Sequence, residues 1–316
     1  MKSAFTALLL SALWVPALSI SYSLRDTVTG SGFFDFFEFQ AISDPTHGRV
    51  NYVDANTARS RGLAVAQSSN SFILRADSNN VLNPGGAGRD SVRVRSRNTY
   101  SHHVAVFDIH HMPEGCGTWP AVWETQESIW PNGGEVDIVE GVNNQSPNAA
   151  TLHTNQGCTM PSSRQQTGQS TQLDCNVAVN GNSGCGVRFP TANSFGPSFN
   201  SNGGGWFAME RSSTNIKVFF WPRNSGSVPN EVRNGAGSVN PDNWGTPIAN
   251  FPNSQCNLDS HFSAHNIIIN LTFCGDWAGS VYGQSGCPGS CVDFVNNNPG
   301  SFRNAFFDLG SIRVYQ

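Results

Sequence analysis

Three carboxylates stand close together in the segment Gly134-Glu135-Val136-Asp137-Ile138-Val139-Glu140-Gly141. Glu135 and Asp137 are two residues apart, so an extended strand would direct both side chains to one face. Glu140 lies at an odd offset and would point to the opposite face unless one extra residue were inserted. A β-bulge near Ile138-Val139 would supply that residue, and bulges are frequent next to active sites. The sequence therefore predicts a bulged strand that carries a row of three acids.

Clustered carboxylates can carry chemistry because like charges raise one another's pKa and cannot all ionise at neutral pH. A charged carboxylate can attack an anomeric carbon while a protonated neighbour donates to the departing oxygen. If Glu135 and Glu140 converge to about 5 to 5.5 Å, no water fits between them and the reaction retains the anomeric configuration. A solvated strand face or a calcium loop is the alternative interpretation. The apolar Val136, Ile138 and Val139 favour a strand buried on one side.

Short alternating or β-branched runs recur along the chain and are separated by clusters of Gly, Asn, Pro and Ser. No helical period of useful length occurs, and this spacing is typical of an antiparallel sandwich or barrel. We predict an all-β jelly-roll sandwich of two antiparallel sheets with a concave substrate cleft. The expected strands cover residues 50–53, 72–76, 91–95, 104–109, 135–139, 206–210, 216–221, 267–273 and 311–315. Segments 162–201 and 224–253 are expected to be surface loops held by disulfides.

The chain begins with Met1-Lys2, followed by an apolar run from Ala4 to Leu18. This pattern predicts a signal peptide over residues 1–20 and a single catalytic domain over residues 21–316. The apolar run is too short for a membrane anchor, and neither a later spanning segment nor a hydrophobic tail for a lipid anchor follows. We expect a secreted, extracellular monomer.

Eight cysteines follow the predicted signal peptide, and an even number in a secreted chain favours disulfides whose connectivity the spacing leaves open. Charged residues make up 13% of the chain and the net charge is -4. No basic patch supports binding to nucleic acid or to an anionic membrane. A neutral polar partner fits better, with no cofactor. Two sequons, beginning at Asn144 and Asn270, are candidate N-glycosylation sites.

Aromatic side chains flank the acids, with Trp123 and Trp130 upstream and Trp277 downstream. Pyranose rings present apolar C–H faces, so flat aromatic side chains near carboxylates suggest sugar subsites, although core packing is about as common for a Trp. His153 follows the acids and could hydrogen-bond them or a sugar hydroxyl from a neighbouring strand. Arg93 lies in another expected strand, where its planar donors could bind a hydroxyl or a carboxylate.

A second group of side chains resembles a metal cluster only in the linear sequence. Strand alternation between residues 104 and 109 distributes these side chains over both faces and strand ends, so we expect no metal site there. The group comprises His102, His103, His110 and His111.

Taken together, the motifs resemble the family 16 glycoside hydrolases, specifically fungal secreted endo-1,3(4)-β-glucanases of the laminarinase type. The resemblance covers nearly the whole chain after the signal peptide and implies a β-jelly-roll sandwich with a long substrate cleft. It rests on the acids, preceded by Trp130-Pro-Asn-Gly-Gly, and on His111-Met112-Pro113, Cys116-Gly-Thr-Trp-Pro-Ala-Val-Trp123, Glu140-Gly-Val-Asn143, Leu152-His153-Thr154, Trp221-Pro-Arg223 and Phe273-Cys-Gly-Asp-Trp-Ala-Gly279.

By residue match, the resemblance implies that Glu135 is the nucleophile, Glu140 the general acid/base and Asp137 the helper between them. It also implies subsite roles for five residues: Arg93, Trp123, Trp130, His153 and Trp277. The expected activity is hydrolysis of β-1,3- and mixed β-1,3/1,4-glucans with retention of configuration. A cell-wall glucan transglycosylase of the same fold and a non-catalytic glucan-binding protein are the alternatives. Some family members bind calcium, but its ligands have no match in this chain, so no metal ligand is assigned and a structural calcium stays open.

Overall fold

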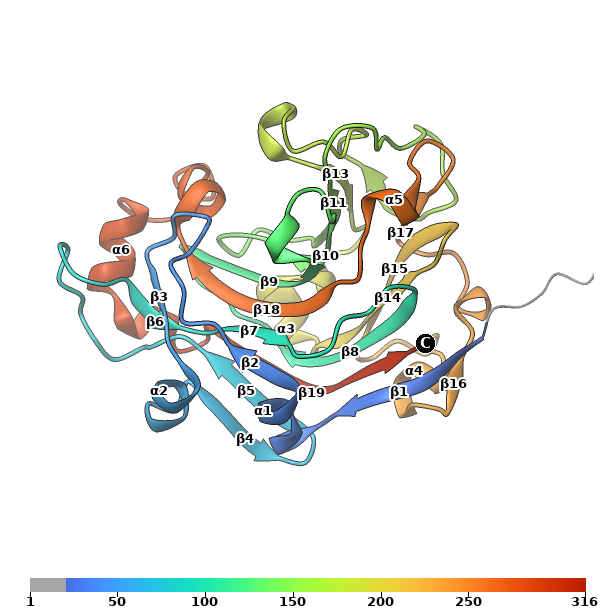
Figure 1. The fold of residues 1–316 in the computed structure, drawn as a ribbon. Helices are drawn as coiled ribbons and strands as arrows, with labels where there is room; N and C mark the ends of the chain where they lie inside the picture. Colours follow the sequence, from blue (N-terminus) through green and yellow to red (C-terminus); the bar gives the residue numbers. More distant parts are fainter. Residues whose placement is uncertain (1–20) are drawn as a thin grey trace, which may run out of the picture.

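The computed structural model describes residues 21–316, so the predicted signal peptide lies outside the described residues. Two large antiparallel sheets are stacked on each other, and Figure 1 shows β9, β10 and β18 in one layer and β1, β8 and β19 in the other. The predicted all-β sandwich is confirmed.

The acids belong to an eight-stranded sheet with the spatial order β12-β13-β11-β10-β9-β18-β7-β2. In chain order its strands are β2 (Phe37–Phe39), β7 (Arg93–Ser96), β9 (Thr118–Thr125), β10 (Glu135–Glu140), β11 (Ala149–His153), β12 (Gln169–Ser170), β13 (Cys185–Arg188) and β18 (Asn266–Phe273). Since β9 and β11 lie on either side of β10, the acids are at the middle of the sheet rather than at an edge.

The second sheet has nine strands in the order β16-β1-β19-β8-β14-β15-β17, with β5 paired to β19 and β4 paired to β5. Its strands are β1 (Tyr22–Val28), β4 (Ala64–Ser68), β5 (Ser71–Arg75), β8 (His103–His111), β14 (Gly205–Arg211), β15 (Asn215–Pro222), β16 (Ser238–Val239), β17 (Ala249–Pro252) and β19 (Phe306–Tyr315). A short parallel pair, β3 (Val50–Tyr52) and β6 (Arg89–Ser91), completes the strands of the described chain.

The core lies between the two sheets and fixes which face of β10 is buried. Val136 and Val139 of β10 are fully buried in the same apolar cluster as Phe107 and Phe207 of the second sheet. Burying side chains of this size contributes about 1.5–3 kcal/mol each. Because the apolar residues of β10 are held inside, the opposite face of the eight-stranded sheet, called the outer face below, receives the acids.

Within residues 21–316, six short α-helices and several single turns occupy connections, although the sequence shows no helical period. The α-helices are α1 (Phe33–Phe36), α2 (Ala55–Ser60), α3 (Gly196–Ser201), α4 (Asn230–Asn234), α5 (Leu258–His261) and α6 (Cys291–Asn297). The 3-10 turns are η1 (Gly30–Gly32), η2 (Glu127–Ile129), η3 (Asn180–Asn182), η4 (Ala192–Ser194), η5 (Pro241–Asn243) and η7 (Pro299–Phe302), and η6 (Gly275–Gly279) is a π-turn. Such elements are too short to show amphipathic periodicity. Within residues 21–316, no helix has the length and apolar character needed to cross a membrane.

The two segments expected to be loops contain regular structure, so that expectation was wrong. Segment 162–201 includes β12, β13 and α3, and segment 224–253 includes α4, β16 and β17. β13 is four residues long, with Cys185 and Val187 buried on the core side. So short a strand offers too few residues for alternation to be recognised. Only the first segment holds a disulfide, Cys175–Cys185, because the second contains no cysteine.

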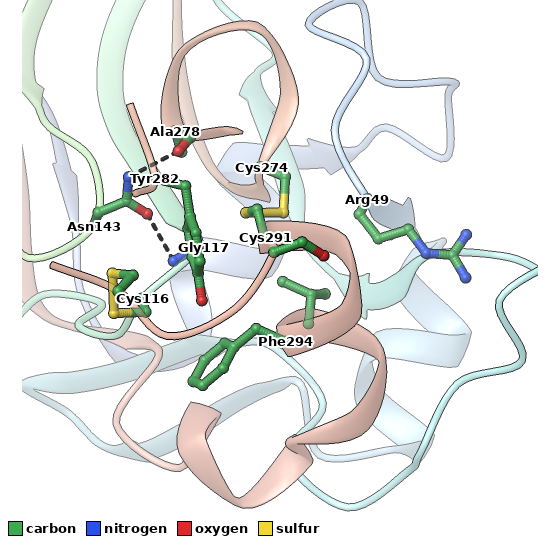
Figure 2. Close-up of a disulfide and its surroundings, with 12 residues drawn as sticks. Arg49, Cys116, Gly117, Asn143, Cys274, Ala278, Tyr282, Cys291 and Phe294 are labelled. Carbon is green, nitrogen blue, oxygen red and sulfur yellow. Dashed lines mark hydrogen bonds between the residues drawn. A yellow bond between two sulfur atoms is a disulfide. The ribbon is translucent and has the colours of Figure 1, made fainter. Parts of the chain in front are cut away.

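Four disulfides pair all eight cysteines: Cys116–Cys287, Cys158–Cys256, Cys175–Cys185 and Cys274–Cys291. Two of them fasten both ends of the segment that follows β18, as Figure 2 shows for Cys274–Cys291. The buried Asn143 side chain adds a third attachment (Figure 2): it accepts from the Gly117 N–H at 2.7 Å and donates to the Ala278 carbonyl at 2.8 Å. These links hold the turn that carries Trp277.

Candidate active site

The three acids form one row on the outer face. Their partners on β9 are Thr125, Trp123 and Ala121. Their partners on β11 are His153, Thr151 and Ala149. Each set consists of alternate residues of a regular strand, and alternate residues share a face. The register shifts on both sides of β10 between Asp137 and Glu140. The predicted bulge is therefore present, and it returns Glu140 to the side of Glu135.

The side chain of Asn148 holds the bulge in shape. Its Nδ2 donates to the Ile138 carbonyl at 2.9 Å, and its Oδ1 accepts from the Glu140 N–H at 2.9 Å. A bulge leaves backbone N–H and C=O groups without hydrogen-bond partners on the neighbouring strands, and buried groups of this kind need another partner. Asn148 is fully buried, so water does not replace it. The position of the Glu140 backbone thus depends on a residue eight positions further along the chain.

Replacing Asn148 by Ala should reduce both stability and turnover. Two buried hydrogen bonds are lost, which we expect to lower the free energy of unfolding by about 2–3 kcal/mol. Displacement of Glu140 by about 1 Å should lower kcat by about 10²-fold. Steady-state kinetics and denaturant unfolding measure the two effects.

Asn200→Ala is a matched control for Asn148→Ala. Asn200 also bridges a backbone pair, accepting from the Met112 N–H and donating to the Met112 carbonyl, each at 2.9 Å. It should cost similar stability without a comparable fall in kcat. An Asn148→Ala protein that unfolds more easily yet keeps the wild-type kcat would show that the bulge does not need this side chain.

Asp137 lies between the two glutamates and is 2% exposed. Burial raises its pKa well above the usual range, and the charges of Glu135 and Glu140 raise it further. A protonated Asp137 can donate the hydrogen bond that it shares with Glu135. His153 faces it from β11, with Nε2 3.4 Å from the Asp137 Oδ2. In its protonated form the middle acid can therefore act as a donor that orients Glu135.

Glu140 is the acid best suited to donate a proton near neutral pH. Burial raises the pKa of Glu140 to about 7, and the charge of Glu135 also raises it. A hydrogen bond from the Trp119 indole and the charge of His153 both lower it. The Trp119 Nε1 donates to the Glu140 Oε1 at 2.9 Å. A pKa close to the working pH is the condition for efficient general acid and base catalysis.

Replacing Trp119 by Phe should move the alkaline limb of the pH–activity profile upward. The indole N–H stabilises charged Glu140, so its loss raises the pKa of Glu140 and keeps the acid protonated at higher pH. A hydrogen bond to a charged group is worth about 1.5 kcal/mol, which corresponds to a shift of roughly one pH unit. The dependence of kcat/KM on pH measures it. Trp130→Phe removes an indole N–H from Glu135 instead and should leave the alkaline limb in place; a common shift in both variants would argue against the assignment.

Of two tryptophans predicted to line subsites, Trp130 contacts an acid and Trp277 lies one ring away. Trp130 is 41% exposed and its Nε1 donates to the Glu135 Oε2 at 2.6 Å. Trp277 packs edge-on against Trp119, with ring centroids 5.7 Å apart. Because Trp119 also contacts Glu140, the disulfide-held turn reaches Glu140 through one intervening ring. That both tryptophans line sugar subsites stays a prediction.

Arg93 reaches the site through Trp123 rather than directly. Its guanidinium lies 5.0 Å from the Trp123 ring centroid, and its side chain is only 4% exposed. The Nε donates to the Gln40 Oε1 at 2.9 Å and the Nη2 to the Glu127 Oε1 at 2.6 Å. With these donors used and little surface open, Arg93 supports the Trp123 ring. The subsite role of Arg93 stays a prediction.

Three further side chains contribute to the site without having been selected from the sequence. Trp119 lies within a segment noted for its aromatics, but nothing local indicates that it hydrogen-bonds Glu140. Asn148 carries no motif. Asn270 has a sequon, yet it is buried on β18, accepts from the Trp123 Nε1 at 2.7 Å and donates to the Tyr52 hydroxyl at 3.2 Å. It orients Trp123, and a glycan there would have to displace these contacts.

Cation binding has one candidate position among residues 21–316. Ligand atoms of Glu135, Asp137 and His153 all lie within 4.8 Å of one another. A cation would compete there with the proton of Asp137, so it would oppose the acid and base roles; that no metal takes part stays a prediction. The four upstream histidines are separated, and each has its own neighbour: Asp259 for His102, Glu124 for His103, Asp108 and Asp308 for His110, and Phe306 for His111.

Residues 37–315 match the family model for the XgeA-like catalytic domain of glycoside hydrolase family 16. The chain belongs to this family. A probable glycosidase of Schizosaccharomyces pombe is 46% identical over 94% of this chain and 70% of its own length. The endo-1,3(4)-beta-glucanase xgeA of Emericella nidulans is 40% identical over 94% of this chain. The match covers 47% of that enzyme, so this family 16 chain spans about half the length of such curated relatives.

Solved family 16 structures agree closely with the fold. Laminarinase 16A from Phanerochaete chrysosporium, with 6-O-glucosyl-laminaritriose in both donor and acceptor sites, has a TM-score of 0.93 and 62% identity, covering 94% of this chain and all of that one. An elongating family 16 β-1,3-glucosyltransferase has a TM-score of 0.87 and 39% identity, covering 93% of this chain and all of that one. The predicted family and its jelly-roll fold are confirmed.

Proposed function

We propose that this family 16 protein is a secreted, monomeric endo-β-glucanase that hydrolyses β-1,3- and mixed β-1,3/1,4-glucans with retention of configuration. The observation that carries the proposal is the bulged row of acids, in which Glu140 has a pKa of about 7 and Glu135 is held by an indole N–H. The xgeA enzyme is an endo-1,3(4)-β-glucanase, and laminarinase 16A binds a β-glucan, which supports the substrate class. Four disulfides support an extracellular location for the domain of residues 21–316.

The reaction proceeds in two displacements. In the first, a carboxylate oxygen of Glu135 bonds to the anomeric carbon as the bond to the leaving sugar breaks, and Glu140 gives its proton to the departing oxygen. Asp137 donates a hydrogen bond to Glu135 and holds its orientation. In the second, charged Glu140 takes a proton from water while the water oxygen bonds to the anomeric carbon and Glu135 is released. Two inversions return the β-configuration.

Substrate scope and stereochemistry can be tested together. The protein is incubated with linear β-1,3-glucan, branched laminarin and mixed-linkage glucan, the fragments are sized, and product anomers are followed by NMR from the first turnovers. The proposal expects internal cleavage that gives a range of oligosaccharides, with β-anomers first. Immediate α-anomers would exclude a double displacement, and release of one small sugar only would exclude endo action.

A transglycosylase is the second candidate because a related family 16 enzyme is an elongating β-1,3-glucosyltransferase. The glycosyl-enzyme would then transfer its sugar to another glucan hydroxyl instead of to water. The ratio of lengthened to shortened oligosaccharides, measured from a single purified oligosaccharide, distinguishes the two. Predominantly lengthened products at low substrate concentration would replace the hydrolase assignment.

A further inference from the structure

A line of directly paired residues runs from Glu140 across the neighbouring strands to the far edge of the sheet. Glu140 pairs with Ala149 on β11, Ala149 pairs with Arg188 on β13, and Arg188 pairs with Gln169 on β12. Directly paired residues of antiparallel strands project from the same face. Ala149, Arg188 and Gln169 therefore lie on the outer face in line with the general acid.

The two polar residues at this edge are available to a ligand. Arg188 and Gln169 are both exposed, and neither side chain has a hydrogen bond or an ion pair to another residue within 21–316. Arg93 and Arg95, on the other side of the acid row, are both paired with Glu127. An arginine has five N–H donors, and those of Arg188 are all unused by the described protein.

The surface between Glu140 and this edge leaves room for a sugar. Ala149 has the only side chain between Glu140 and Arg188 in the row, and it is a methyl group. Next to Arg188 the surface has a hollow of about 380 Å³, lined also by Gln169, Thr167 and Pro147. Donors from Arg188, an amide from Gln169 and an apolar proline face together suit a pyranose, which has hydroxyls at its rim and apolar C–H faces.

The distance between strands determines which sugar unit would lie beside Arg188. Neighbouring strands are about 4.8 Å apart, so β13 lies about 10 Å from β10. A glucosyl unit is about as long as one strand spacing. We infer that Arg188 and Gln169 form a glucosyl-binding subsite two sugar units from the cleaved bond on the β12–β13 side, and that Arg188 donates to its hydroxyls. This inference rests on the proposed function and adds a determinant of chain length to it.

The test is kcat/KM on β-1,3-linked oligosaccharides of increasing length for the wild-type protein and Arg188→Ala. The wild type should become more efficient at the length that fills the β13 subsite. Arg188→Ala should lose this increase, by roughly tenfold or more, because a hydrogen bond from a charged donor is removed. The shortest cleaved oligosaccharide should be hydrolysed as fast as by wild type. End-labelled substrates should also show a shift in the position of cleavage.

Arg303→Ala is the matched control, since Arg303 is likewise exposed and has no hydrogen bond or ion pair within 21–316. It should behave as wild type at every length. Equal kinetics of Arg188→Ala and wild type at all lengths would overturn the subsite while leaving the proposed function intact. An equal loss at all lengths would assign Arg188 to folding or to the acid row and would also overturn it. A wild-type protein that cleaves none of the glucans refutes the proposed function, and the subsite with it.

Discussion

Glu135→Gln should lower the release of reducing ends from β-1,3-glucan by on the order of 10⁴-fold or more. The amide has nearly the shape of the carboxylate but cannot attack the anomeric carbon, so no glycosyl-enzyme forms. Glucan binding should persist, because the neighbouring aromatic rings are unchanged. Initial rates at matched protein concentration measure the loss, and calorimetric titration with an oligosaccharide measures the retained binding.

Glu114→Gln controls for the isosteric change in Glu135→Gln. Glu114 accepts hydrogen bonds from Asn200 at 2.9 Å and Asn304 at 2.8 Å and lies beyond the end of β8. The two bonds go to different oxygens of Glu114, so the amide oxygen of Gln keeps one of them and loses the other. Glu114 has no contact with the three acids, so activity should be unchanged. If Glu135→Gln keeps an appreciable fraction of the wild-type rate, Glu135 is not the nucleophile. If the wild-type protein itself releases no reducing ends, the non-catalytic glucan-binding interpretation gains support.

Glu140→Gln should lower turnover of the natural glucan by about 10³-fold, within the range of a lost general acid. The loss should depend on the leaving group, which separates Glu140 from Glu135. An aryl β-glucoside whose leaving group departs without a proton should still form the glycosyl-enzyme rapidly. Water then lacks its general base, so the covalent intermediate should accumulate on Glu135 and be visible by mass spectrometry of the intact protein.

Glu135→Gln is the comparison variant for Glu140→Gln on the aryl glucoside. It should form no adduct and should be as inactive on the aryl substrate as on glucan. If Glu140→Gln were equally inactive on both substrates, its role would be positional rather than proton transfer. An adduct on Glu140 in place of Glu135 would reverse the two assignments.

The acid row shows how far local sequence carries a prediction. Glu135, Asp137 and Glu140 have an offset that no regular strand accommodates, and that mismatch alone predicts a bulge. The alternation of Val136 and the residues around it predicts which face is buried. Both features depend on neighbours within a few residues, which is why they were predictable and are present in the fold. The short strands and helices were not predicted, because they contain too few residues to show a repeating pattern.

For the subsite residues, the residue type could be read from the sequence but its hydrogen-bond partner could not. Arg93 has planar donors that a sugar could use, yet two of its five donors bind Gln40 and Glu127 from other parts of the chain. Asn270 carried a sequon, yet its side chain is buried between Trp123 and Tyr52. A sequence shows that a group can donate or accept; it does not show which partner takes the bond.

By itself, the sequence determined the acids, the bulge, the β class and the aromatic character of the surroundings, because each depends on residues only a few positions apart. Tertiary structure alone decided that Asn148 braces the bulge, that Trp119 contacts Glu140, that Cys274 pairs with Cys291, and that Arg188 stands in the row of the general acid. Those relations join segments whose separation along the chain has no fixed period, so they arise only once strand pairing and close packing have brought the segments together.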